Sequence, residues 1–190
     1  MALEIELPVG FESITIKQWS DYRNAKSDIE RLCALTQKSK EEISQLKLVQ
    51  LNELIQFFES MLSTNDAKFQ PLITIGKNTY GFIPDLYSIS TGEYVDLMQY
   101  VSDEGENILK IMQILYRPVI KQIGEKYLIA PYRVEELKFY EDDIASIKME
   151  FYRGAMLFFS SLQNQLNESL QEYLMNQALM IQKNLVNEMQ

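Results

Sequence analysis

The last third of the chain is a proline-free stretch with the apolar spacing of a long helix. No proline follows Pro131, and from about Asp143 onward no residue requires a break. Apolar residues that recur at three- and four-residue steps lie on one face of a helix. These residues are Leu162, Leu166, Leu170, Leu174, Ala178, Ile181, Leu185 and Met189. The sequence therefore predicts a long C-terminal helix, or a pair of helices, over residues 146–190.

The polar face of this predicted helix consists mainly of amides. Beyond Arg153 the charged residues are Glu168, Glu172, Lys183 and Glu188. A solvated helix face usually interleaves Glu and Lys, whereas amides are easier to bury because they can pair with one another. We therefore expect an interaction arm, although compositional drift in an AT-rich genome is an alternative explanation. The candidate interface residues are Leu162, Leu166, Leu170, Leu174, Ile181, Leu185, Gln163, Gln171 and Gln177.

Residues 1–145 are predicted to form a helical domain with an embedded β-hairpin. Ile14 and Ile16 alternate with polar neighbours, which predicts a short half-buried strand. From about Ser20 the spacing becomes helical, and we expect one continuous apolar stripe. Its members are Tyr22, Ala25, Ile29, Leu32 and Leu35.

Capping boxes, in which serine is followed three residues later by glutamate, predict where helices begin. Ser39 with Glu42 predicts a short helix, and Ser90 with Glu93 predicts another. A further helix is expected to begin near Leu48.

Residues 107–116 are apolar on nearly every side, which predicts a helix in the centre of the core. Pro118 is expected to end this helix. Arg117 would then lie at its C-terminus, where a cation interacts favourably with the helix dipole. The alternative is that Arg117 binds an anion.

A β-hairpin is predicted at about residues 69–83. Two extended, β-branched segments flank Gly76, Lys77 and Asn78, which can supply the positive φ of a tight turn. Residues 126–129 form another candidate strand. The predicted fold class is therefore mainly α with a small β-hairpin element (α+β), with a helical core and a long C-terminal helix.

The residue types in the chain argue against catalysis. There is no histidine, which is the most frequent proton-transfer residue and metal ligand. The single cysteine, Cys33, adjoins the apolar stripe and is interpreted as a buried structural thiol. We predict no catalytic, cofactor-binding or metal-binding residues. The formal net charge of −9 also opposes binding to nucleic acid and to anionic membranes.

Two acidic clusters leave an enzyme open as an alternative. Asp103, Glu104 and Glu106 form one cluster, and residues 141–143 form the other. Paired carboxylates can hydrolyse glycosides or bind a divalent metal. The favoured interpretation is a loop for the first cluster and helix N-terminal charge for the second.

Several segments carry a resemblance to a known class of protein. They are residues 84–97 (PDLYSISTGEYVDL), residues 106–118 (ENILKIMQILYRP), Ile14-Thr15-Ile16, and the helix around Phe158 and Phe159. Over about residues 10–175 the chain resembles small proteins of tailed bacteriophages, described as tail assembly chaperones or virion structural proteins. The resemblance rests on core and cap residues and transfers no active-site residue.

This resemblance implies a non-enzymatic role in phage morphogenesis, as a tail assembly chaperone or a tail component. The partners would be other phage structural or tail proteins, the tape-measure protein among them, within an oligomer or a larger assembly. The implied locations are the host cytoplasm during assembly and the virion. The alternatives are a ring component of the neck or baseplate, a small inhibitor of a host protein, and a carboxylate-based enzyme.

Overall fold

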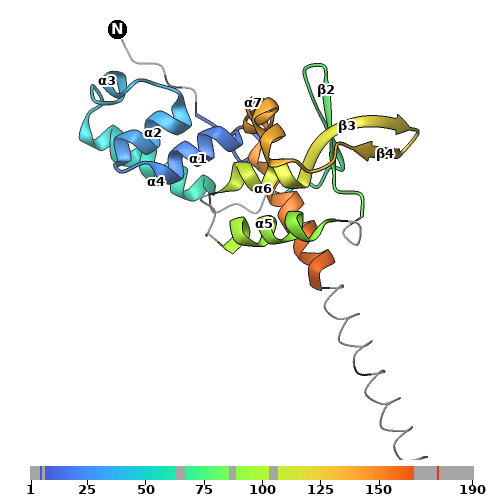
Figure 1. Cartoon of the computed structure of the whole chain (residues 1–190). Helices are drawn as coiled ribbons and strands as arrows, with labels where there is room; N and C mark the ends of the chain where they lie inside the picture. The colour runs from blue at the N-terminus through green and yellow to red at the C-terminus, as the bar shows by residue number, and fades with distance from the viewer. Residues whose placement is uncertain are drawn as a thin grey trace, which may run out of the picture. The chain divides into compact units, whose positions relative to one another are not determined.

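The computed structural model describes residues 5, 7–62, 67–85, 89–102, 107–164 and 175. Contacts divide the chain into two units, Met1–Ala155 and Met156–Gln190. The first unit combines helices with one four-stranded antiparallel sheet (Figure 1). The predicted α+β class with a helical core is confirmed.

The N-terminal region is helical from Ile16 onward. Its helices are α1 (Ile16–Asn24), α2 (Asp28–Thr36), α3 (Lys40–Ile43) and α4 (Leu48–Leu62). The Ser39–Glu42 capping box is confirmed at α3: the Ser39 side chain accepts a hydrogen bond from the Glu42 backbone, and the Glu42 side chain accepts one from the Ser39 backbone.

The predicted strand at Ile14 and Ile16 is wrong. Thr15 between them is the N-cap of α1 and forms a capping box with Gln18. Ile14 and Ile16 are both fully buried, and Thr15 forms only an isolated bridge with Lys148. The alternating pattern therefore arose from a polar cap between two core residues.

The single helical stripe predicted from Tyr22 to Leu35 is also wrong, because two helices share it. The backbone leaves the helical conformation at Ala25, and Ser27 caps α2 by accepting a hydrogen bond from the Glu30 backbone. Ser27 and Glu30 have the spacing of a capping box, so the sequence did contain a signal for this second helix start.

The sheet has the strand order β1-β2-β3-β4. The strands are β1 (Leu72–Ile75), β2 (Asn78–Phe82), β3 (Tyr116–Ile123) and β4 (Lys126–Ile129). The hairpin predicted at 69–83 is confirmed, with Gly76 at φ +57° in its turn. The predicted strand at 126–129 is confirmed as well, whereas β3 was not predicted.

Two helices between β2 and β3 complete the core, α5 (Thr91–Ser102) and α6 (Ile108–Leu115). The Ser90–Glu93 capping box is confirmed at α5, with both of its hydrogen bonds present. Tyr94 of α5 is 40% exposed. The core position of α6 is confirmed, since its buried residues are Ile108, Ile111, Met112, Gln113, Ile114 and Leu115.

Pro118 does not end α6, and Arg117 does not lie at its C-terminus. The helix ends at Leu115 and β3 begins at the next residue. Tyr116 pairs with Phe82 and Arg117 with Gly81. This long-range pairing with β2 determines where the helix ends.

After the sheet, a 3₁₀ helix η2 (Val134–Phe139) leads into α7 (Glu141–Ser146). The backbone is extended at Ile147, and residues 149–164 are helical. Gly154 allows this last helix to approach Lys68 closely, because a Cβ at Gly154 would lie 2.2 Å from the Lys68 carbonyl carbon.

Candidate functional site

The two hairpins of the sheet diverge (Figure 1). A groove of about 500 Å³ lies between them. The pairing of β2 with β3 stops at Tyr80 and Pro118, although β2 extends to Asn78 and β3 extends to Ile123. We name this the hairpin groove. Its lining residues are Lys77, Asn78, Thr79, Tyr80, Pro118, Val119, Ile120, Lys121, Gln122, Phe139 and Tyr140.

A register shift in β3 decides which residues share a face with the groove. Val119 pairs with Ile129 and Lys121 pairs with Leu128, so Ile120 between them has no partner in β4. Such a bulge reverses the alternation of side chains beyond it. Lys121 and Ile123 therefore lie on the same sheet face as Pro118, with Leu128 beside them.

The opposite face of the sheet is tightly packed around Gly81. Tyr127 and Ile129 lie over Gly81 so closely that a Cβ there would be 2.6 Å from the Tyr127 ring. The Tyr127 hydroxyl also donates a hydrogen bond to the Phe82 carbonyl, at 2.9 Å. At Gly81 this face is therefore covered by the sheet's own side chains.

The face that carries the groove exposes large apolar side chains beyond the core. Ile120 is 59% exposed, Ile123 68%, Leu128 55% and Phe139 76%. We name these four residues the apolar patch. Single exposed apolar residues are common on soluble proteins, but residues gathered beside a groove are typical of a binding surface.

Asp143 holds the inner end of the groove in place. Its carboxylate accepts hydrogen bonds from the Asn78 amide, at 2.8 Å, and from the Tyr80 hydroxyl. These two bonds lower the pKa of Asp143. Burial, together with the hydrogen bond to the Asp143 carboxylate, raises the pKa of Tyr80 well above its ordinary value. Tyr80 therefore stays protonated and serves as part of the wall.

Tyr140 stands next to Tyr80, with ring centroids 6.0 Å apart. Burial raises its pKa to about 12, and its hydroxyl donates to the Gln113 carbonyl of α6 at 3.3 Å. The wall of the groove is thus anchored to the core helix.

The acidic residues 141–143 form the first turn of α7, which confirms their prediction as helix N-terminal charge. The sequence did not indicate that Asp143 would also bind β2. The other acidic cluster, Asp103, Glu104 and Glu106, lies outside the described residues.

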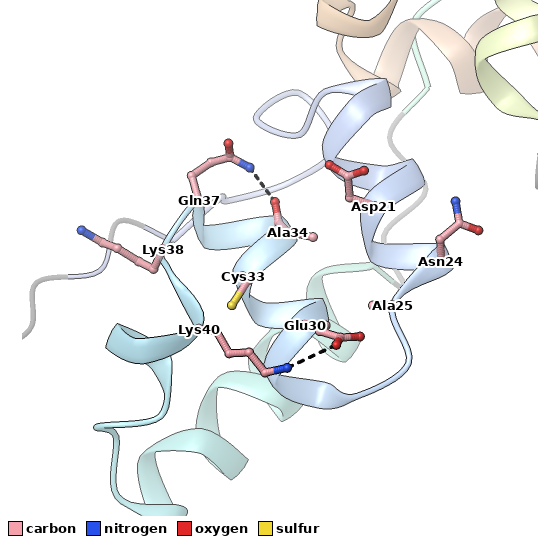
Figure 2. A pocket seen from close by; sticks show the side chains of 9 residues that line it. All are labelled: Asp21, Asn24, Ala25, Glu30, Cys33, Ala34, Gln37, Lys38 and Lys40. Atoms are coloured by element: carbon pink, nitrogen blue, oxygen red, sulfur yellow. Dashed lines mark hydrogen bonds and ion pairs between the residues drawn. The ribbon is translucent and has the colours of Figure 1, made fainter.

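A second hollow of about 580 Å³ lies over α1 and α2, and Figure 2 shows its side chains. Cys33 lines this hollow and is half-buried rather than fully buried as predicted. Burial raises the pKa of the Cys33 thiol. Because the thiolate is the reactive form, this cysteine is a weak nucleophile. The nearby Glu30 and Lys40 form an ion pair at 3.4 Å.

Of the candidate interface residues in the C-terminal arm, Leu162 and Gln163 lie in the described helix, where both are half-buried. The remaining candidates, Leu166, Leu170, Leu174, Ile181, Leu185, Gln171 and Gln177, lie outside the described residues. The interface assignment to this arm stays a prediction.

Within the described ranges, no group of three or more Cys, Asp or Glu side chains is arranged to bind a metal ion. No described helix combines the length and apolar character needed to cross a membrane. Comparisons of the chain with protein-family models, curated proteins and solved structures found no match.

Proposed function

We propose that this protein is a non-catalytic assembly component that binds other proteins through the hairpin groove and the adjoining apolar patch. The observation that carries the proposal is the exposure of Ile120, Ile123, Leu128 and Phe139, each more than half exposed. Fully burying one such side chain stabilises a complex by about 1.5–3 kcal/mol. A partner that covers several of them therefore gains substantial affinity.

The chemistry of the two hollows also supports binding over catalysis. The polar groups in the groove wall are used for support, because Asp143 is bonded to Asn78 and Tyr80. In the other hollow, burial keeps the Cys33 thiol in its less reactive protonated form. A general base or nucleophile needs a pKa close to the working pH. The pKa of Asp143 is lowered and the pKa of Cys33 is raised, so both move away from neutral pH.

The sequence resemblance to tailed-phage proteins supports a narrower proposal. The protein would act in phage morphogenesis, as a tail assembly chaperone or a tail component, with the tape-measure protein among its candidate partners. The amide-rich sequence of residues 163–184, predicted to form one face of a helix, favours a fixed place in a neck or baseplate ring as the second candidate. A face of that kind suits permanent burial between subunits better than repeated release.

The proposal can be tested by co-expression with the proteins encoded beside this gene, followed by co-purification. Ile123→Lys and Leu128→Lys should abolish a complex that the unaltered protein forms. Leu48→Lys is the matched control, because Leu48 is 70% exposed but lies on α4. Equal loss from all three variants, or from none, would contradict the proposed surface.

Mass spectrometry of purified phage particles separates the two narrower roles. A ring component should be present in the finished particle at fixed stoichiometry, and a tail assembly chaperone should be absent from it. If the protein joins neither the particle nor any assembly intermediate, the phage role is wrong.

A further inference from the structure

We infer that the hairpin groove binds an extended, acidic segment of a partner protein as an added β-strand. This inference rests on the proposed function and specifies the chemistry of the partner and the mode of binding. Open strand edges, the shape of the groove and its charge each support it.

In the part of the chain that the structure describes, the strand edges beside the groove have no strand partner. Residues 78–79 of β2 pair with β1 on one side, and residues 119 and 121–123 of β3 pair with β4 on one side. Within the described chain, β2 and β3 pair with each other only from Tyr80 and Pro118 inward. Unpaired edges offer backbone donors and acceptors to an extended peptide, which is how strand addition works.

Side chains around the edges suit the alternation of an added strand. Tyr80 and Pro118 lie at the closed end of the groove, and Phe139 and Ile120 belong to the same lining. Because successive side chains of a strand point to opposite faces, alternate residues of the bound segment would contact these apolar walls. The segment should therefore carry an apolar residue at every second position.

The charge of the groove selects an acidic segment. Among the described residues, Lys77 and Lys121 line it and no carboxylate does, although the whole chain carries a net charge of −9. Asp143 reaches the groove wall, but its carboxylate accepts hydrogen bonds from Asn78 and Tyr80. Glutamate or aspartate side chains of the segment would be attracted to the two lysines.

The same lysines argue against a second copy of this chain as the occupant. Pairing two identical β3 edges would bring like charges at Lys121 toward each other, which destabilises a strand pair. Lysine on an edge strand is a common device against self-pairing. The groove therefore disfavours a second copy of this chain and favours an acidic strand.

A designed peptide in which glutamate alternates with valine serves as the probe, titrated into the full-length protein. We expect saturable binding, and we expect hydrogen exchange to slow at the backbone amides of residues 78–79 and 119–123. A control peptide has the same sequence with alternate backbone amides methylated. It keeps its side chains but loses the backbone N–H hydrogen-bond donors at the methylated positions. It should bind at least about tenfold more weakly, a loss of about 1.4 kcal/mol.

Charge is tested with the double variant Lys77→Glu/Lys121→Glu. It should weaken binding of the glutamate peptide about tenfold and favour a peptide with lysine in place of glutamate. Lys47→Glu is the control, because Lys47 is exposed on the helical part of the chain. Equal binding of the methylated peptide, no binding of either peptide, or a dimer that Lys121→Glu strengthens would overturn the inference.

These outcomes are separable from those of the proposed function. If Ile123→Lys abolishes a natural complex while backbone methylation and lysine reversal have no effect on peptide binding, the interaction role stands and strand addition is wrong. If none of these changes affects any complex, both are wrong.

Discussion

Glu93 and Arg117 form an ion pair in the protein interior, with Glu93 Oε1 2.7 Å from Arg117 Nη2 and both side chains less than one-tenth exposed. The second carboxylate oxygen, Oε2, accepts a hydrogen bond from the Ser90 backbone at the start of α5. Arg117 lies in β3 opposite Gly81. One carboxylate thus joins the beginning of α5 to the middle of the sheet.

Removing one member of this pair should be costly, because the other charge is left buried without compensation. Glu93→Gln is expected to lower the free energy of unfolding by about 3–5 kcal/mol, measured by urea denaturation. The double variant Glu93→Leu/Arg117→Met should recover most of that loss, since apolar replacements of both partners are often tolerated. A single-variant loss below about 1 kcal/mol would show that the pair is unimportant.

Gly154→Ala should destabilise the protein although alanine is the better helix former. A Cβ at Gly154 would lie 2.2 Å from the Lys68 carbonyl carbon, so the backbone must shift, at about 1–3 kcal/mol for overpacking. Gly92→Ala in α5 is the matched control, because its nearest neighbour would be 3.9 Å away. Thermal unfolding of both variants should show a loss at Gly154 alone.

Asp143 should make stability depend on pH in the acid range. Hydrogen bonds from Asn78 and Tyr80 lower its pKa below the ordinary 3.8. The contribution of Asp143 to the free energy of unfolding is therefore fully present above pH 3.8 and is lost as the pH falls through the lowered pKa. Asp143→Ala should cost roughly 1–3 kcal/mol at neutral pH. The difference from the unaltered protein should shrink in acid. Asp142→Ala, at an exposed position in the same turn, is the control and should cost less at neutral pH, because it leaves the bonds of Asp143 to Asn78 and Tyr80 intact.

Cys33 should react slowly in the native protein. Burial raises the pKa of its thiol, so little thiolate is present at neutral pH. We expect alkylation by iodoacetamide to be slower than for the same protein unfolded in urea, and its rate to rise at higher pH than for a free thiol. Native labelling as fast as unfolded labelling would contradict this assignment.

The parts of the fold that sequence predicted correctly have local signals. Gly76 supplies a turn residue, and Ser39 and Ser90 each stand three residues before a glutamate that completes a cap. These devices depend only on neighbours along the chain. The hairpin and two helix starts could therefore be placed without knowledge of the tertiary structure.

The hairpin groove could not be predicted in the same way. The end of α6 at Leu115 depends on Tyr116 pairing with Phe82, a residue distant in sequence. Asp143 looked like simple helix N-terminal charge, because its contact with Tyr80 exists only after the sheet and α7 have packed. The groove is formed by residues that are distant in the sequence, so a local sequence pattern does not predict it.

The unpaired Ile120 gives β3 one residue more than its ladder with β4 uses. Deleting Ile120 would leave the rest of the β3 sequence unchanged. Lys121 would then follow Val119 directly and both could keep their partners in β4, so Ile123 would stay on the face that carries Leu128. Such a deletion would therefore remove the bulge and its exposed apolar side chain without changing the faces of the residues beyond it.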